Sequence, residues 1–134
     1  MLNHPPTQVK GFNPYGDLIG LTLSRLDEGH SQFTLEVNGR LRNPYGVLHG
    51  GVISSMADTG MGAALYTCLN DGESCATAEI KITYLRAVTS GTLICDTKVI
   101  HKGRRIAFLE SEVWNSERLV AKASGTYSIF QARK

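Results

Sequence analysis

A single acidic residue stands in a long stretch of small and apolar side chains near the middle of the sequence. The stretch runs from Asn43 to Leu69, and Asp58 is its only charged residue. A carboxylate without a basic neighbour is costly to bury unless it has a partner. It can act as a general base toward water or as a nucleophile, or it can be a structural residue bonded to nearby backbone. The residues alone leave these interpretations open.

A histidine followed by two glycines opens the apolar part of this stretch. His49 is followed by Gly50 and Gly51. The first amides of a helix lack intrahelical acceptors and carry partial positive charge, and glycines allow a ligand to approach them. The pattern suits polarisation of a carbonyl oxygen that becomes an oxyanion. A tight turn with close packing is the alternative explanation.

These residues need a helix to position them. Apolar side chains recur at helical spacing after the two glycines, and no proline interrupts them. Asp58 lies seven residues after Gly51, which is close to two turns, so the two residues share a helical face. Ser55 and Gly62 border the carboxylate at one-turn spacing. The turn residues 70–72 are predicted to end the helix.

Six strand-like segments flank the predicted helix, two before it and four after it. Their ranges are Leu18–Leu23, Gln32–Val37, Cys75–Leu85, Gly91–His101, Arg105–Trp114 and Arg118–Phe130. Alternation in the third strand places Thr77 on the face opposite Ile80 and Ile82. Short connections favour antiparallel neighbours, so the predicted fold class is α+β, with one helix against one side of a six-strand sheet. Such a sheet has exposed edges, and pairing with a second copy would cover one of them.

Length and composition limit the possible functions. With 134 residues, the chain is predicted to form one domain, 1–134, in which residues 1–16 form an arm with at most a short helical turn. A net charge of +2 without a long basic tract gives no indication of nucleic-acid binding. No apolar run has the length of a signal peptide or a membrane span, and the cysteines lack disulfide or zinc spacing. We expect a cytoplasmic protein.

Common metal and cofactor motifs do not occur in the sequence. The histidines show no metal-ligand spacing, and no dinucleotide-binding or P-loop glycine pattern is found. No metal and no cofactor is expected. Lys102, Arg104 and Arg105 surround a predicted hairpin tip, where they are either a solvated surface or donors to the phosphates of a ligand.

The sequence around the two glycines resembles a known enzyme family. The run NPYGVLHGGVISSMAD is similar to the signature of hotdog-fold acyl-CoA thioesterases of the phenylacetyl-CoA thioesterase-like branch. The similarity continues in TAEIKITYLRA, VIHKGRR and LVAKASGTY, and so covers nearly the whole chain from Asp17 onward. The resemblance implies a six-strand antiparallel sheet wrapped around one long central helix. It also implies a homodimer with a continuous twelve-strand sheet, commonly paired into a homotetramer, with active sites at the subunit interface.

The resemblance also implies roles for individual residues. The implied reaction is hydrolysis of an acyl-CoA thioester to a carboxylate and free CoA, without metal, with Asp58 as base or nucleophile. The N–H of Gly50 would polarise the thioester carbonyl, and His49 would orient the loop. Asn43 would position water or the thioester, and Thr77 would reach the same water from the sheet. Asp58 and Gly50 would come from different chains.

Residues expected to contact the substrate lie on the helix, before it and at the basic hairpin tip. They are Tyr45, Gly51, Ser55, Met61, Gly62, Lys102, Arg104 and Arg105. An aryl or medium-chain acyl group is expected. Two other functions stay open, namely a hotdog acyl-CoA hydratase or dehydratase, which would need a histidine–acid pair, and a non-catalytic acyl-CoA-binding protein.

Overall fold

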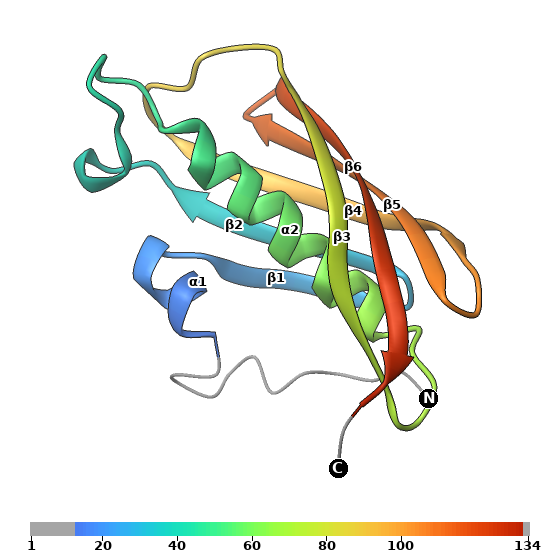
Figure 1. Cartoon of the computed structure of the whole chain (residues 1–134). Coiled ribbons are helices and arrows are strands. Elements are labelled where there is room, and N and C mark those ends of the chain that lie inside the picture. Colours follow the sequence, from blue (N-terminus) through green and yellow to red (C-terminus); the bar gives the residue numbers. More distant parts are fainter. Residues whose placement is uncertain (1–12, 133–134) are drawn as a thin grey trace.

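An antiparallel sheet curves around the helix α2, Gly50–Tyr66, in the computed structural model of the chain (Figure 1). The structure describes residues 13–132, and within them the sheet has six strands in the order β1-β2-β4-β5-β6-β3. The strands are β1 (Thr22–Asp27), β2 (His30–Glu36), β3 (Glu73–Tyr84), β4 (Thr92–Lys102), β5 (Ile106–Asn115) and β6 (Arg118–Gln131). All neighbours are antiparallel. The predicted α+β hotdog fold is confirmed.

Helix α2 begins at a histidine cap and ends at a threonine. The His49 Nδ1 atom accepts a hydrogen bond of 2.8 Å from the Gly51 N–H. At the other end, the Thr67 hydroxyl donates to the Ala64 carbonyl at 2.7 Å and accepts from the Gly29 amide at 2.8 Å. The predicted end of the helix at residues 70–72 is wrong, because these residues lie in the connection to β3.

One face of α2 packs against the sheet and the other is open. The buried residues of the helix are Val52, Ile53, Met56, Ala57, Gly60, Met61, Ala64 and Leu65. Each large apolar side chain buried in this way stabilises the fold by roughly 1.5–3 kcal/mol. The opposite face carries Gly51, Asp58 and Tyr66, which are exposed.

Buried hydroxyl groups fix the position of α2 over the sheet. A Cβ atom on Gly60 would lie 2.6 Å from Thr97 Oγ1, so the close approach of α2 to β4 requires glycine here. The Ser31 hydroxyl donates to the Gly60 carbonyl at 2.7 Å, and the hydroxyls of Thr97 and Ser111 are 2.7 Å apart. All three hydroxyl side chains are fully buried, and each has a partner. These hydrogen bonds therefore hold the helix at a defined distance from the sheet.

The first predicted strand is wrong in its N-terminal half. Helix α1, Pro14–Ile19, occupies this part of the chain, and β1 begins only at Thr22. The Asn13 side chain accepts a hydrogen bond of 3.1 Å from the Gly16 N–H, and Gly20 ends the helix with a φ of 84°. These are standard helix-start and helix-stop residues, which outweighed the apolar alternation. The other strands agree with prediction to within two residues, whereas most of the predicted arm, up to residue 12, lies outside the described residues.

A β-bulge interrupts the alternation of β3. The register with β6 shifts between Thr77 and Glu79, which leaves Ala78 without a partner in the ladder. Because of this extra residue, Thr77 faces α2 together with Ile80 and Ile82. The prediction that Thr77 lies on the opposite face is therefore wrong.

Strand β3 forms one edge of the sheet, and most of its side chains are exposed. Its outer edge carries backbone N–H and C=O groups that can pair with another strand. A short 3-10 turn, Gly39–Leu41, precedes the loop that leads into α2. Within residues 13–132, no helix combines the length and the apolar character needed to traverse a bilayer.

Candidate active site

Two hydroxyl groups from the sheet hold the carboxylate of Asp58. The Thr77 hydroxyl on β3 donates to Asp58 Oδ1 at 2.6 Å, and the Tyr127 hydroxyl on β6 donates to the same oxygen at 2.5 Å. The carboxylate is exposed in the single chain, so its charge remains hydrated rather than buried. In the described part of the chain, nothing donates a hydrogen bond to Oδ2.

The sheet brings the two hydroxyl donors together. Thr77 and Tyr127 are direct partners in the β3–β6 ladder, and both side chains face α2. Tyr127 is only 2% exposed. Burial raises the pKa of its phenol, and the hydrogen bond to Asp58 raises that pKa further. Tyr127 therefore remains protonated and donates to the carboxylate at neutral pH.

A thiol lies beside the same carboxylate. Cys75 precedes Thr77 by two residues on the same face of β3 and is half-buried. Burial raises the pKa of this thiol, and the negative charge of Asp58 raises it further. Cys75 is therefore a neutral neighbour of Asp58 rather than a thiolate.

The N-terminus of α2 leaves the Gly50 amide without an acceptor in the described part of the chain. The Gly51 N–H is bonded to the His49 ring, and the Val52 N–H donates to the His49 carbonyl at 3.0 Å. Among residues 13–132, none accepts a hydrogen bond from the Gly50 N–H. Because the Nδ1 atom of His49 accepts, the neutral ring carries its proton on Nε2. Gly50 thus presents the free donor of the helix terminus.

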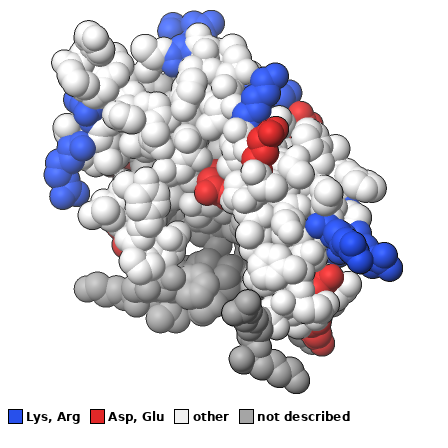
Figure 2. Space-filling model, in the orientation of Figure 1, with Lys and Arg blue, Asp and Glu red and all other residues white. Residues whose placement is uncertain are grey.

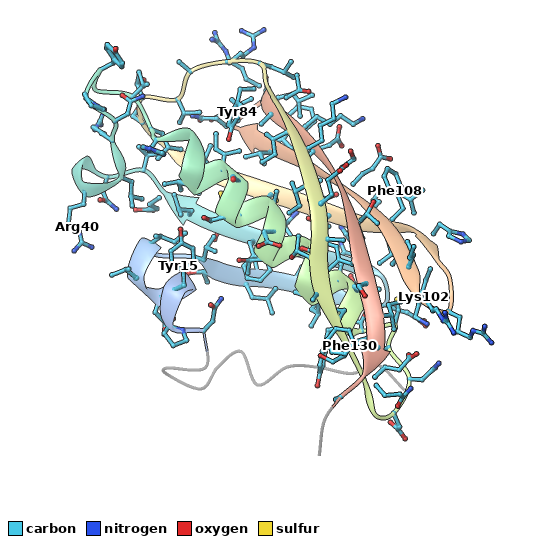
Figure 3. All side chains as sticks on the ribbon, in the orientation of Figure 1. Tyr15, Arg40, Tyr84, Lys102, Phe108 and Phe130 are labelled. Atoms are coloured by element: carbon cyan, nitrogen blue, oxygen red, sulfur yellow. The ribbon has the colours of Figure 1, made fainter. Side chains whose placement is uncertain are left out.

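Tyr84 closes over the same helix terminus from the end of β3 (Figure 3). Its hydroxyl donates to the Gly50 carbonyl at 2.8 Å, and a Cβ atom on Gly50 would lie 3.2 Å from its ring. A cavity of about 320 Å³ opens beside this contact. It is lined by Leu48, Gly50, Ile53, Tyr84, Leu85, Arg86, Ala87 and Val88.

The predicted site residues before the helix shape the loop rather than bond to Asp58. The Asn43 Oδ1 atom accepts hydrogen bonds from the Tyr45 N–H at 2.9 Å and from the Val47 N–H at 3.3 Å. The Tyr45 side chain is 90% exposed. The predicted role of Asn43 in positioning water or the thioester therefore stays a prediction.

Ser55 lies on the open side of α2 with its hydroxyl engaged. It donates to the Gly51 carbonyl at 2.8 Å, and the Tyr15 hydroxyl lies 2.8 Å from the Ser55 oxygen. Since Ser55 has one hydroxyl proton, Tyr15 is the donor in the second bond. Helix α1, which carries Tyr15, thereby contacts the face of α2 on which Asp58 lies.

The two predicted contact residues after Asp58 differ in their surroundings. Met61 is fully buried, and its sulfur packs against Gly125, where a Cβ atom would lie 2.5 Å away. Met61 therefore belongs to the core in this chain. A Cβ atom on Gly62 would meet nothing within 4 Å, so Gly62 borders open space one turn after Asp58.

The two halves of the predicted site do not meet within one chain. Asp58 follows Gly50 by eight residues of α2, which is about 12 Å along the helix axis. A carbonyl oxygen within hydrogen-bonding distance of the Gly50 N–H therefore lies too far from the Asp58 carboxylate of the same chain for a reaction.

The basic hairpin tip also lies far from the helix terminus. Lys102 is 3.9 Å from the Glu73 carboxylate at the start of β3, whereas Tyr84 contacts Gly50 at its end. Eleven residue steps of extended strand correspond to about 36 Å. Figure 3 shows Lys102 and Tyr84 at opposite ends of the sheet. Arg104 and Arg105, which follow Lys102, are exposed.

The face that displays α2 and β3 is mostly uncharged, with Lys and Arg side chains at its margins (Figure 2). No group of three or more His, Cys, Asp or Glu side chains gathers as a metal site in residues 13–132. The three cysteines are free thiols. Two groups on this face are thus suited to catalysis. They are the Asp58 carboxylate, which two hydroxyl groups hold, and the Gly50 N–H at the start of α2.

Comparison with known proteins identifies the family. Residues 45–122, more than half of the chain, match the family model described as the thioesterase superfamily. The chain belongs to this superfamily. A curated relative, the proofreading thioesterase EntH of Klebsiella pneumoniae, is 27% identical to this superfamily member over 99 residues, which cover 74% of this chain and 72% of EntH.

Solved structures of similar chains share this fold, and one of them is named a thioesterase. The conserved protein PA5202 from Pseudomonas aeruginosa is 38% identical, with a TM-score of 0.84 and coverage of 87% of this chain and 93% of that one. The thioesterase HI1161 from Haemophilus influenzae is 27% identical, with a TM-score of 0.84 and coverage of 90% and 85%. These similarities agree with the hotdog fold of this superfamily member.

Sequence reasoning missed Tyr127 and Tyr84 as parts of the site. Tyr127 occupies an inward position of an alternating strand, among smaller buried residues. A tyrosine at such a position was the one indication in the sequence that its hydroxyl contacts the site. Tyr84 ends its strand, and nothing in its spacing indicates contact with Gly50.

Proposed function

We propose that this superfamily member hydrolyses acyl-CoA thioesters with an aryl or medium-chain acyl group, as in the phenylacetyl-CoA thioesterase-like branch that its sequence resembles. The observation that carries the proposal is the free Gly50 N–H at the N-terminus of α2. A preorganised amide at a helix terminus suits a thioester carbonyl oxygen, whose negative charge grows in the transition state.

Asp58 completes the chemistry from a second chain in this proposal. Its carboxylate takes a proton from water while the water oxygen attacks the thioester carbon, and the CoA thiolate leaves. In the nucleophilic version, the carboxylate attacks the thioester carbon first and the C–S bond breaks, which releases the CoA thiolate and leaves a mixed anhydride that water then hydrolyses. Both versions use the Gly50 N–H in the same way.

Pairing of two chains along β3 would bring the two halves together. Antiparallel pairing centred near Ile80 and Lys81 would place Thr77 of one chain opposite the partner's Tyr84. Asp58 would then approach the partner's Gly50, since each is bonded to one of these strand residues. The exposed outer edge of β3 supports this arrangement, which would give a homodimer with a twelve-strand sheet.

The same pairing gives the basic hairpin tip a role. Antiparallel β3 strands place the start of one strand near the end of the other. Lys102, Arg104 and Arg105 would therefore lie near the partner's Gly50, where their charges could bind the phosphates of CoA.

The contacts of His49 favour hydrolysis over hydration. Its Nδ1 atom accepts from the Gly51 N–H, and within the described residues no carboxylate bonds to its ring. The Nδ1 atom is thus used to hold the loop, which is the role that the thioesterase resemblance implies, whereas a hydratase would need this histidine to act together with an acid on the substrate.

The proposal is tested with benzoyl-, phenylacetyl-, short-chain and long-chain acyl-CoA, with release of free CoA thiol as the measurement. We expect the wild-type protein to release CoA and Asp58→Asn to lose about a hundredfold or more in rate. Hydration of an enoyl-CoA without thiol release would instead support the hydratase. Binding of acyl-CoA without either reaction would support a non-catalytic acyl-CoA-binding protein.

A further inference from the structure

Tyr127 makes two contacts with the same residue of α2. Its hydroxyl lies 2.5 Å from the Oδ1 atom of Asp58 and 2.8 Å from the Asp58 carbonyl oxygen. The phenol is almost fully buried, and its ring belongs to the core below α2. Strand β6 thus supports the carboxylate from beneath with a side chain that has little freedom to move.

The two hydroxyl donors act on one oxygen of the carboxylate. Thr77 and Tyr127 both donate to Oδ1, and hydrogen bonds to a charged oxygen are stronger than bonds between neutral groups. An exposed aspartate on a helix can otherwise rotate among several side-chain rotamers. With Oδ1 held, the orientation of the carboxylate is fixed, and Oδ2 is the oxygen that remains for the substrate or water.

We propose that Tyr127 is a positioning residue for the reactive carboxylate, which together with Thr77 anchors Oδ1 of Asp58 and leaves Oδ2 as the reacting oxygen. This inference rests on the proposed function of Asp58 in hydrolysis. Tyr127 does not touch the substrate, and it acts only through the orientation of Asp58.

A purely structural role for the phenol would require only one partner. A buried tyrosine hydroxyl needs a hydrogen bond, and the Asp58 carbonyl oxygen at 2.8 Å would satisfy that need. The shorter contact is with the carboxylate, and its direct ladder partner Thr77 donates to the same atom. Two hydroxyl groups from adjacent strands donate to one oxygen, and this arrangement fixes the orientation of the carboxylate.

Kinetics of a Tyr127 variant and a control separate positioning of the carboxylate from a structural role. Tyr127→Phe is expected to lower kcat about ten- to a hundredfold, the effect of losing one hydrogen bond to a charged group, with KM changed less than about twofold. Tyr66→Phe removes a phenol hydroxyl from the end of the same helix and is expected to keep the wild-type kcat. If Tyr127→Phe lowers the melting temperature but keeps kcat, the tyrosine is structural and the inference is overturned.

Two substitutions of Thr77 test whether its hydroxyl or its shape supports the rate. Thr77→Val removes the hydroxyl at nearly constant shape and is expected to lower kcat by a similar factor. Thr77→Ser keeps the hydroxyl and is expected to retain most of the wild-type kcat. A loss in Thr77→Ser with unchanged kcat in Thr77→Val would show that the methyl group matters rather than the donor, and would contradict anchoring of Oδ1.

Proton NMR tests the anchoring independently of activity. A short bond to a carboxylate predicts a downfield, slowly exchanging hydroxyl proton that disappears in Tyr127→Phe and moves upfield in Asp58→Asn. Absence of this resonance in the wild-type protein overturns the inference even if hydrolysis is observed. If no thioester is hydrolysed, the proposed function fails, and the resonance still decides whether Tyr127 holds the carboxylate.

Discussion

The hydroxyl of Tyr84 donates a hydrogen bond of 2.8 Å to the carbonyl of Gly50. This bond joins the last residue of β3 to the first residue of α2, so the edge of the sheet and the helix terminus are fixed relative to each other. The free N–H of Gly50 is therefore held in a constant direction. Any ligand that uses this amide meets a preorganised donor.

Gly50→Ala tests this arrangement. The new Cβ atom would lie 3.2 Å from the Tyr84 ring, so the ring or the helix terminus must shift. We expect kcat/KM for acyl-CoA to fall about a hundredfold, because the shift misaligns the Gly50 N–H and loss of an oxyanion donor costs about 10²–10³ in rate. Gly39→Ala, where a Cβ atom meets nothing within 4 Å, is the control. Unchanged turnover in Gly50→Ala would contradict the role of this amide.

Mixing two inactive variants tests whether the site spans two chains. Asp58→Asn and Gly50→Ala are co-expressed, so that half of the dimers contain one chain of each kind under random pairing. A site built across the interface leaves one intact site in every mixed dimer, and roughly a quarter of the wild-type activity is expected. If each site is built within one chain, the mixture stays as inactive as the separate variants. The measurement is CoA release per total protein.

Replacement of Arg104 and Arg105 by alanine tests the role of the hairpin tip. We expect KM for acyl-CoA to rise several-fold, while small thioesters without CoA are hydrolysed as before, because only CoA carries the phosphates. Added salt should raise the wild-type KM in the same direction. Arg25→Ala on β1, at the edge of the sheet farthest from β3, is the control for loss of an arginine away from the hairpin tip. Equal losses for both kinds of substrate would show a structural role for the arginines.

Two glycines of α2 should respond oppositely to alanine. In Gly60→Ala the new Cβ would lie 2.6 Å from Thr97 Oγ1, so we expect a loss of about 1–3 kcal/mol in the free energy of unfolding. Gly62→Ala meets open space and is expected to gain up to about 1 kcal/mol from helix propensity. Urea unfolding of both variants measures the difference. Reduced activity in a stabilised Gly62→Ala would support contact of Gly62 with substrate, whereas equal stability changes would contradict the packing at Gly60.

The thiol of Cys75 should report the charge of Asp58. Burial and the neighbouring carboxylate raise its pKa, so less thiolate is present at a given pH and alkylation is slowed. In Asp58→Asn the charge is absent, and we expect Cys75 to react several times faster with iodoacetamide at pH 8. Mass spectrometry resolves the three cysteines, and fully buried Cys95 serves as an unreactive reference. An unchanged rate would place the carboxylate away from the thiol.

The sequence predicted the elements better than the contacts between them. Apolar spacing located α2 and five of the six strands, because packing against the core imposes a helical or strand period on the apolar residues. The strand at Leu18–Leu23 was wrong because Asn13, Pro14 and Gly20 specify a short helix over the same residues. In such a short segment, the capping residues determine whether a helix or a strand forms. The pattern of apolar residues does not show this effect.

The candidate site was predictable in part. The resemblance implied that Thr77 reaches the water of the site from the sheet, although alternation placed this threonine on the wrong face of β3. Tyr127 was missed because it lies 69 residues from Asp58 in sequence and reaches it only through the β3–β6 pairing. Contacts of this kind depend on strand register, which a single sequence does not specify.

Because of the bulge at Ala78, the number of residues in β3 is more strongly constrained than the identity of most of them. Many exposed positions of the strand can accept other side chains without disturbing the core. Deleting Ala78 would instead restore strict alternation, and either Thr77 would turn away from the carboxylate or Ile80 and Ile82 would turn away from the helix. Related chains should therefore vary in the residues of this strand far more readily than in their number.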